Sequence, residues 1–382
     1  MSYSIDTRTL EPSDIFIPIK GSRFDGHNYI QDALRKGAKK ILDIDIGEYS
    51  KYIRKEKLKA TIVGITGSSG KTTVKDLLTH ILKSSFKVHK TTANNNNEIG
   101  LPLTILNAPE DTEIIVAEMA MRKRGDLEYL ANLAKPNISL ITNIGSAHIG
   151  FLKTRKNIAL AKSEIFKFKK ISGQKHITFL NSNIDYFSLL KDKATNNNIE
   201  VYTFTETNIL TQNSSLAKQT ALYFNIPEKI INERIASFQS NSPHRQKTIP
   251  FQNTLIIDDS YNANPESMSF AIEKACTDYP NKSIIVILGE MKELGEKEKY
   301  YHHKLIKQVL KNSRISNGFF IGTAYKYYEK FVKNTGKCYY FDNQSSIATR
   351  LKSMDFNNKI LLIKGSRSME LEKVVQLLSD VN

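Results

Sequence analysis

The chain has 382 residues and a formal net charge of +16, from 55 basic and 39 acidic side chains. This length predicts two or three domains that each bury a core of their own. The sequence contains no run of about 18 apolar residues, so no membrane span is predicted. The first residues lack the basic and apolar parts of a signal peptide. Cys276 and Cys338 form neither a disulfide framework nor a metal-ligand spacing. These features predict a cytoplasmic protein.

The positive charge does not by itself identify a partner. The lysines are scattered, are densest between Lys51 and Lys59, and are rarely interleaved with aromatic residues. A nucleic-acid partner is therefore not predicted, because a basic patch with a reading element is missing. A phosphorylated small substrate fits the charge equally well.

Residues 1–58 are predicted to form a small N-terminal α/β domain. It contains the apolar run 15–19 and the glycine-containing stretch 20–27. A helix is expected from Tyr29 to Lys36, with Gly37 at its C-terminal cap. Taken alone, the residues around the glycines favour a β-hairpin with an ordinary turn.

Residues 64–73, Gly-Ile-Thr-Gly-Ser-Ser-Gly-Lys-Thr-Thr, carry the strongest functional signal. An apolar run precedes them and a helical repeat follows, so they join a buried strand to the N-terminus of a helix. Backbone N–H groups in such a turn bind phosphates. Lys71 would reach the β- and γ-phosphates, and the Thr72 hydroxyl would hold Mg²⁺. The alternative is a glycine-rich turn that binds nothing.

Residues 59–242 alternate strand and helix, which predicts a mostly parallel sheet covered on both faces. Ligands bind beyond the C-terminal ends of such strands. Thr72, Glu118 and His148 follow three of them and can gather around Mg²⁺; the alternative for His148 is a loop histidine with local hydrogen bonds. The asparagine-rich stretch 91–100 is expected to be a shaped recognition loop. Strands are expected at 61–66, 113–117, 138–142, 176–180 and 200–204, and helices at 72–84, 125–134, 156–169, 215–224 and 228–238.

Residues 243–382 are predicted to form a C-terminal Rossmann-like α/β domain without a second phosphate loop. The segment 258–265, Asp-Asp-Ser-Tyr-Asn-Ala-Asn-Pro, follows its first strand, where a cleft would open. Strands are expected at 254–258, 284–288, 317–321, 338–341 and 359–363.

These motifs together resemble the Mur ligase family. Residues 64–73 match its Thr-Gly-x-x-Gly-Lys-Thr-Thr loop, and 94–103 resemble its Asn-x-Asn-Asn-x-x-Gly-x-Pro-Leu stretch. The segments 118–126, 141–148 and 161–166 resemble its acidic, histidine and lysine segments. The C-terminal segments 258–265, 288–295 and 364–368 resemble the type that adds D-alanyl-D-alanine to UDP-N-acetylmuramoyl-tripeptide in peptidoglycan precursor synthesis.

The resemblance implies the three-domain Mur ligase architecture and an ATP-dependent peptide ligase. A substrate carboxylate becomes an acyl phosphate, and an amine then displaces phosphate to give an amide. The implied catalytic residues are Lys71, Glu118, His148 and Lys162. Two Mg²⁺ ions are implied, with Thr72, Glu118, His148 and Lys162 as ligands, the last as a carbamate. The alternative for Lys162 is an exposed helix lysine.

The resemblance also implies the remaining binding residues. In the C-terminal domain, which would bind adenine and the incoming amine, Asn262 and Asn264 would read adenine, Asp259 the ribose and Arg245 the phosphates. The nucleotide residues implied are Gly67, Ser68, Ser69, Gly70, Lys71, Thr72, Thr73, Arg245, Asp259, Tyr261, Asn262 and Asn264. The substrate residues implied are Thr7, Arg8, Lys20, Gly21, Arg23, Asp25, Gly26, His27, Asn94, Asn96, Asn97, Lys364, Ser366 and Arg367. A monomer is expected.

Two departures from the family pattern bear on the substrate. The Asp-Thr-Arg motif begins at Asp6, so the strand-rich segment that usually precedes it is missing. Between Leu180 and Ser214 the chain is trimmed, and Gln212-Asn213 stands in for a Gly-x-His-Asn segment. The shortened N-terminal domain leaves open a related amide ligase with a different acid and amino acid. The charge of +16 leaves open a P-loop ATPase acting on nucleic acid.

Overall fold

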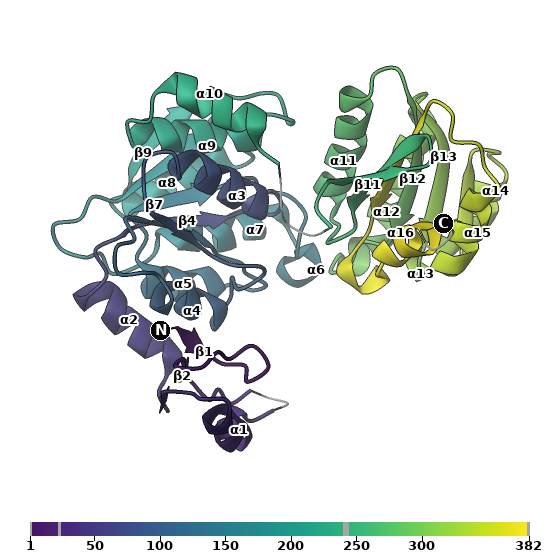
Figure 1. The fold of residues 1–382 in the computed structure, drawn as a ribbon. Helices are drawn as coiled ribbons and strands as arrows, with labels where there is room; N and C mark the ends of the chain where they lie inside the picture. Colours follow the sequence, from purple (N-terminus) through teal and green to yellow (C-terminus); the bar gives the residue numbers. More distant parts are fainter. Residues whose placement is uncertain (1, 22–23, 240–243, 380–382) are drawn as a thin grey trace. The chain divides into compact units, whose positions relative to one another are not determined.

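The computed structural model describes residues 2–21, 24–239 and 244–379. The chain forms two compact units, each of which is built from separate stretches of sequence (Figure 1). Unit 1 comprises Met1–Thr142, Ala159–Glu206 and Asn213–Phe238, and unit 2 comprises Asn143–Ile158, Thr207–Gln212 and Gln239–Asn382.

The N-terminal segment of unit 1 is a small parallel sheet with three helical elements. Its strands β1, β2 and β3 are two residues long and hydrogen-bond in that order. The predicted helix is confirmed, and Gly37 follows it with a φ of 87°. The strand β2 pairs in parallel on both sides, whereas the residues around the glycines form a short antiparallel bridge between Lys20 and Asp25, as the hairpin alternative expects. The elements are β1 (Tyr3–Ser4), β2 (Ile15–Phe16), η1 (Gly26–Tyr29), α1 (Ile30–Arg35), β3 (Lys40–Ile41) and α2 (Ile46–Glu56).

The main sheet of unit 1 has six strands in the order β5-β6-β4-β7-β8-β9. All five pairings are parallel, as predicted. The short strand β5 was not expected from the sequence, because only one of its three residues is apolar. The strands are β4 (Thr61–Thr66), β5 (Val88–Lys90), β6 (Ile114–Glu118), β7 (Ile138–Ile141), β8 (Ile177–Asn181) and β9 (Glu200–Phe204).

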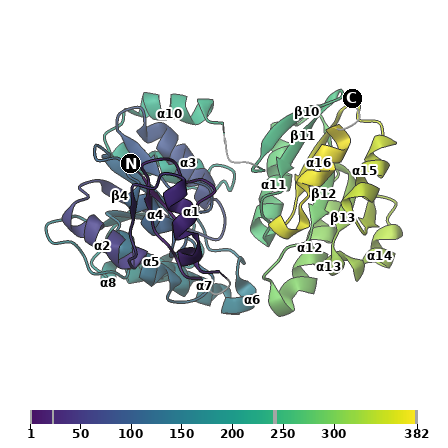
Figure 2. The ribbon, with the colours of Figure 1, turned by 60° about the horizontal axis from the view of Figure 1, so that its bottom comes forward.

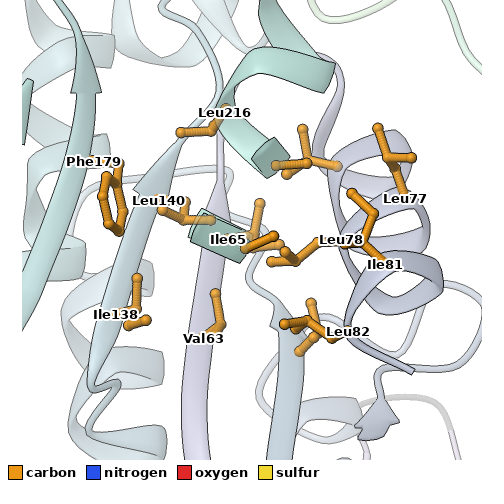
Figure 3. Packing of buried hydrophobic residues seen from close by; sticks show 14 of the residues in the cluster. Val63, Ile65, Leu77, Leu78, Ile81, Leu82, Ile138, Leu140, Phe179 and Leu216 are labelled. Atoms are coloured by element: carbon orange, nitrogen blue, oxygen red, sulfur yellow. The ribbon is translucent and has the colours of Figure 1, made fainter. Parts of the chain in front are cut away.

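Helix α3 packs one face of this sheet. Leu77, Leu78, Ile81 and Leu82 recur at helical spacing and point at the apolar side chains of the central strands (Figure 3). Helices α9 and α10 complete the same core. The elements that accompany the strands are α3 (Lys71–Leu82), α4 (Gly100–Leu106), α5 (Asp126–Ala134), α7 (Arg155–Lys162), η2 (Ser163–Phe166), α8 (Phe187–Asn196), α9 (Gln212–Tyr223) and α10 (Glu228–Ser237).

The N-terminal segment is anchored to the main sheet by a buried arginine. The Arg54 guanidinium of α2 donates to the carbonyls of Ala134 (2.8 Å), Lys135 (3.1 Å) and Ala60 (3.2 Å). The first two carbonyls lie at the C-terminal end of α5, where a helix favours a cation. Apolar side chains of the segment also pack against α4.

Unit 2 contains a second six-stranded sheet, in the order β10-β11-β15-β12-β13-β14. Four pairings are parallel, and the edge strand β10 is antiparallel to β11. The five predicted strands are present, whereas β10 was missed because Pro250 and polar residues interrupt it. The strands are β10 (Lys247–Phe251), β11 (Thr254–Asp259), β12 (Ser283–Gly289), β13 (Ile315–Ile321), β14 (Cys338–Phe341) and β15 (Lys359–Lys364).

Helices cover this sheet as well (Figure 2). Apolar residues of α15 and α16 form one core with the strands, and α11 packs beside α12. Among the described residues, no helix is long and apolar enough to cross a membrane. The helical elements are α6 (Ile149–Leu152), α11 (Pro265–Asp278), η3 (Gly295–Lys297), α12 (Glu298–Lys311), α13 (Thr323–Lys326), α14 (Glu329–Lys333), α15 (Gln344–Lys352), η4 (Arg367–Met369) and α16 (Glu372–Ser379).

Candidate functional site

The loop between β4 and α3 depends on its glycines. Gly67 has a φ of 154° and Gly70 a φ of 78°, which side chains rarely adopt. A Cβ on Gly67 would lie 1.8 Å from Thr142 Oγ1, and one on Gly70 would lie 2.5 Å from Asn213 Oδ1. The side chains of Thr142, just after β7, and of Asn213, at the start of α9, therefore lie against the loop and leave no room for a Cβ at either glycine.

Two further contacts hold the loop in place. Lys71 Nζ donates to the Gly67 carbonyl at 2.8 Å, so its ammonium folds over the loop. Thr142 Oγ1 donates to the Ser69 carbonyl at 2.5 Å. The carbonyls are thus turned toward protein donors, and Gly70 stands at the N-cap of α3. This arrangement suits a phosphate, since the helix N-terminus carries a partial positive charge.

The Glu118 carboxylate lies next to the loop and is 2% exposed. Thr72 Oγ1 donates to Oε2 at 2.8 Å, and Asn96 Nδ2 donates to Oε1 at 2.9 Å. The backbone N–H of Glu118 donates to Thr91 Oγ1 at 3.0 Å. The structure therefore brings Thr72 and Glu118 together, and their predicted role as ligands of one Mg²⁺ stays a prediction. Asn96, predicted to contact substrate, contacts this carboxylate.

A buried lysine that sequence reasoning missed completes the surroundings of Glu118. Lys75 Nζ lies 3.8 Å from Glu118 Oε2 and 3.6 Å from Asp76 Oδ1, and its side chain is 3% exposed. Asp76 in turn pairs with Lys90 at 2.6 Å. The available signal was a lysine one helical turn after Thr72, on a face of α3 that is otherwise buried.

Lys162 ends α7 inside unit 1 and is 1% exposed. The alternative of an exposed helix lysine is therefore wrong. Burial, together with the positive charge of Lys71, holds the pKa of Lys162 well below its ordinary value of 10.5. Both effects favour the neutral amine form of Lys162 over the ammonium, and the neutral amine is the nucleophilic form.

His148 belongs to unit 2 and pairs there with an acidic side chain. Its Nδ1 lies 2.5 Å from Glu293 Oε2, and its backbone is left-handed, with a φ of 63°. The Gly150 N–H donates to the Glu293 carbonyl at 2.9 Å, which fastens α6 to the stretch before η3. The expected place of His148 among the ligands around Glu118 stays a prediction.

The predicted nucleotide residues of unit 2 have protein partners. Asp259 is buried, and Lys364 Nζ donates to its Oδ2 at 2.7 Å and to the Asn262 carbonyl at 2.9 Å. Desolvation raises the pKa of Asp259 despite the nearby lysine. The Asn264 side chain accepts the Ser267 N–H at 2.9 Å and caps α11.

Arginines flank this segment. The Arg245 guanidinium stacks over the Tyr261 ring, 3.9 Å from its centroid. Arg367 pairs with Glu372 at 2.6 Å. Ser366 Oγ accepts the Lys292 N–H at 3.1 Å. The two segments 258–265 and 364–368, which the sequence analysis singled out, therefore lie next to each other in unit 2. Asp259 and Asn264 already make structural contacts there.

The predicted substrate residues near the N-terminus form local polar clusters. Arg8 pairs with Asp6 at 2.7 Å, and Thr7 is buried. His27 lies between Asp25 (2.5 Å) and Asp43 (3.2 Å), and hydrogen bonds to these carboxylates raise the pKa of His27.

The surrounding residues shape the same stretch. Lys20 lies 3.8 Å from Asp25, and Gly21 N donates to the Phe24 carbonyl. A Cβ on Gly26 would lie 2.6 Å from the Ile19 nitrogen, so only glycine fits there. The predicted residue Arg23 lies outside the described residues.

A cavity of about 420 Å³ opens within unit 1, between β1, β5 and α4. Its polar lining includes Asp6, His89, Lys90 and Asn107. The predicted residues Asn94 and Asn97 lie in the loop that borders it, where Asn97 Oδ1 accepts the Gly100 N–H at 2.9 Å. His89 and Lys90 were missed as site candidates because β5 itself was missed.

Comparisons with known families cover almost the whole chain. Residues 2–67 match the description "Mur ligase family, catalytic domain", residues 65–241 "Mur ligase middle domain" and residues 244–367 "Mur ligase, glutamate ligase domain".

Individual relatives agree with these matches. The UDP-N-acetylmuramoyl-tripeptide–D-alanyl-D-alanine ligase of Bacillus subtilis (strain 168) is 30% identical, over 97% of this chain and 91% of its own length. A crystal structure of MurF from Acinetobacter baumannii has the same fold, with a TM-score of 0.85, 24% identity and coverage of 99% and 93%. The MurF ligase of Thermotoga maritima, solved in complex with ADP, has a TM-score of 0.81, 26% identity and coverage of 99% and 97%.

Proposed function

Because the chain belongs to the Mur ligase family, we propose that it uses ATP to join D-alanyl-D-alanine to UDP-N-acetylmuramoyl-tripeptide. The relatives that span it are ligases of this type. The observation that carries the proposal is the pairing of Thr72 with Glu118 beside the Lys71 loop. This is the arrangement that phosphoryl transfer requires of a protein.

The loop would bind the β- and γ-phosphates of ATP. Lys71 would leave the Gly67 carbonyl and turn to the γ-phosphate, since a phosphate is the stronger acceptor for an ammonium. There it would neutralise charge that spreads over the transferring group, which is the main source of catalysis in such reactions.

Thr72 and Glu118 fit a Mg²⁺ ion. Their hydroxyl and carboxylate oxygens lie 2.8 Å apart and are the hard oxygen donors that Mg²⁺ prefers. Few protein ligands are needed, because phosphates and water complete its shell. When bound, the ion would neutralise phosphate charge. Asn96 would orient Glu118 by holding its other oxygen.

The chemistry consists of two displacements. A carboxylate oxygen of the tripeptide attacks the γ-phosphorus, the bond to the bridging oxygen breaks, and ADP leaves with that electron pair. The free amine of D-alanyl-D-alanine then attacks the acyl carbon. Inorganic phosphate leaves, the nitrogen loses a proton, and an amide remains. Water must be kept from the acyl phosphate in between.

We further propose that Lys162 is carbamylated. Its neutral amine nitrogen would attack CO₂ and release one proton, leaving an anionic carbamate. Burial and the positive charge of Lys71 both disfavour a charged ammonium on Lys162, whereas an anionic carbamate at this position would attract Lys71. Its oxygens would suit a second Mg²⁺, for which His148 is the other predicted ligand.

The other residue roles are proposed on the resemblance alone. In unit 1 the cavity beside the Asp6 segment and the asparagine loop offers room for part of the UDP-linked substrate. A reaction that consumes ATP and a UDP-linked precursor belongs in the cytoplasm.

The first experiment is phosphate release from ATP with UDP-N-acetylmuramoyl-tripeptide, with and without D-alanyl-D-alanine. Release that requires both substrates, with a pentapeptide product by mass spectrometry, is expected. Lys71→Ala and Glu118→Ala should abolish it, and the matched variant Lys83→Ala, at the end of the same helix, should not. Release that ignores the dipeptide would point to a related ligase with another acid and amine, and stimulation by nucleic acid without an amide product would point to an ATPase.

Carbamylation is tested without turnover. Carbon-13-labelled bicarbonate should give a carbamate carbon signal by NMR in the parent protein, and Lys162→Met should lose it. Lys156→Met, an exposed position on the same helix, should keep the signal. A signal that persists in Lys162→Met would contradict the assignment. Partial recovery of Lys162→Ala activity by a small carboxylic acid would support it.

A further inference from the structure

Two helical stretches of unit 2 carry exposed aromatic rings and exposed lysines. Tyr327 is 68% exposed, Tyr300 62% and Phe331 44%. Lys299, Lys326 and Lys330 are exposed beside them. We call these six residues the aromatic–basic face. The scattered lysines of the sequence did not predict it, because folding brings two separate helical stretches together.

Ring contacts join the two stretches into one surface. The Lys299 ammonium lies 4.3 Å from the centroid of the Tyr327 ring, and Tyr328 Oη donates to the Lys299 carbonyl at 2.9 Å. His303 stacks on Tyr328 at 5.0 Å and meets the edge of Phe331 at 5.9 Å. Helix α12 and the α13–α14 stretch are therefore neighbours along this face.

The exposed rings are not part of the core of unit 2. The same helices bury a separate set of side chains, among them Leu305, Ile306, Tyr325 and Val332. The aromatic rings of the face thus remain in water although the helices have already satisfied their packing. Exposed apolar groups that gather at one place mark interaction sites.

The charge of this region favours an anionic partner. Helices α12, α13 and α14 contain seven lysines and two glutamates. One of the glutamates, Glu329, is already paired with Lys333 at 2.7 Å. The excess is entirely lysine, whose flexible point charge suits a diffuse anionic surface. Tyrosine and lysine side chains together are typical of the boundary between lipid headgroups and acyl chains.

We infer that the aromatic–basic face binds the surface of a membrane that contains anionic lipids. Tyr300, Tyr327 and Phe331 would enter the headgroup region, and the lysines would lie against the lipid phosphates. The attachment is reversible and peripheral, since three rings bury little apolar area. Each lysine near an anionic surface raises the partition coefficient by about fivefold, and salt screens this effect.

The experiment measures sedimentation of the full chain with vesicles. Vesicles of phosphatidylcholine with about a third of phosphatidylglycerol are compared with vesicles of phosphatidylcholine alone, in low and high salt. Binding to the anionic vesicles that falls steeply with salt is expected. Equal binding to both kinds of vesicle, or none to either, would overturn the inference.

Variants locate the binding on the face. Lys299→Glu combined with Lys326→Glu and Lys330→Glu should lower partitioning by about a hundredfold or more. The matched control carries Lys191→Glu, Lys193→Glu and Lys229→Glu, exposed positions on α8 and α10 with the same change in charge. An equal loss in the control would contradict a local site.

A second substitution tests the rings. Tyr327→Ser should weaken binding while the salt dependence persists, because the lysines remain. A change in sedimentation of the protein alone would instead show that this face joins two copies of the chain. Binding to a DNA oligonucleotide without binding to anionic vesicles would assign the face to nucleic acid. Ligase activity and thermal unfolding of each variant report that it is folded.

Discussion

Glu118 receives hydrogen bonds from two different elements at its two oxygens. Thr72 approaches from α3 and Asn96 from the loop before α4. Lys75 adds a buried positive charge on the Thr72 side. A carboxylate held in this way needs little rearrangement when a metal ion and phosphates arrive, since its rotamer is already fixed.

Removing the amide of Asn96 should therefore weaken the metal site without dismantling it. For Asn96→Ala we expect a loss of about 10- to 100-fold in activity, as is typical of a partner that orients a ligand. The apparent affinity for Mg²⁺ should fall in parallel, measured by titrating Mg²⁺ at saturating ATP.

The control for this variant is Asn334→Ala, an exposed asparagine at the end of α14, which should match the parent protein. An Asn96→Ala protein with unchanged Mg²⁺ dependence but poor use of the UDP-linked substrate would return Asn96 to the substrate role expected from the sequence.

Sequence patterns identified the residues of this site that lie in continuous motifs. Lys71, Thr72 and Glu118 follow directly from the loop and the strand end. Lys75 and Thr142 escaped notice because each contributes through a contact that only the folded sheet creates. The pairing of Asp259 with Lys364 was equally invisible, since those residues lie on two neighbouring strands far apart in sequence.

The hydrogen bonds from Arg54 of α2 to the C-terminal end of α5 can be tested by substitution. Burial lowers the pKa of Arg54 to about 10, so its guanidinium remains charged at neutral pH. Arg54→Met would leave several buried carbonyls without donors, at a cost of about 1–3 kcal/mol for each. We expect a loss of at least about 3 kcal/mol in unfolding free energy, measured by urea denaturation.

The exposed Arg35 offers the matched substitution, because its side chain is 79% exposed. Arg35→Met should change stability by less than about 0.5 kcal/mol. Equal effects of the two substitutions would mean that α2 is not anchored through Arg54.

Helix α12 contains a histidine that should make unit 2 sensitive to acid. His302 is fully buried; its Nε2 accepts the Met291 N–H at 2.9 Å, and its Nδ1 donates to the Glu298 carbonyl at 2.8 Å. Burial lowers the pKa of His302 below 6.5. As the pH falls, His302 therefore binds a proton in the unfolded chain at a higher pH than in the folded chain. The free energy of unfolding should decrease as the pH drops below about 6.5.

The measurement is the thermal midpoint between pH 8 and pH 5. His302→Gln should be less stable at pH 8, yet it should lose less on acidification than the parent. A parallel decline in the two proteins would assign the acid sensitivity to other groups, such as His176, whose pKa burial also lowers.

Periodic apolar runs gave the central strands and the amphipathic helices close to their observed bounds. Helices α2 and α4 were not predicted although both contain several apolar residues, and three further missed elements carry weaker patterns. Strand β5 has three half-buried residues, β10 contains a proline, and α8 buries only Leu190 and Ala194. In each of these, packing against neighbours determines the structure more than local pattern does.

For the whole molecule, nucleotide binding should couple to stability. If Mg-ADP binds only the folded protein, a concentration of about a hundred times its dissociation constant should raise the free energy of unfolding by about 2.7 kcal/mol. Hydrogen exchange in β4 and β6 should slow accordingly. Lys71→Met should abolish the effect, whereas slowing that persists in this variant would place the nucleotide elsewhere.

The two units are interleaved along the chain, and this matters while the protein is being made. Residues 143–158 belong to unit 2, although most of that unit lies after residue 239. When the ribosome has produced all of unit 1, the stretch that includes Ile149 and Leu152 still lacks the partners that bury it. In the nascent chain this apolar stretch stays exposed to solvent until about 140 more residues have been synthesised. A stop in translation near residue 240 would therefore release a fragment prone to aggregate.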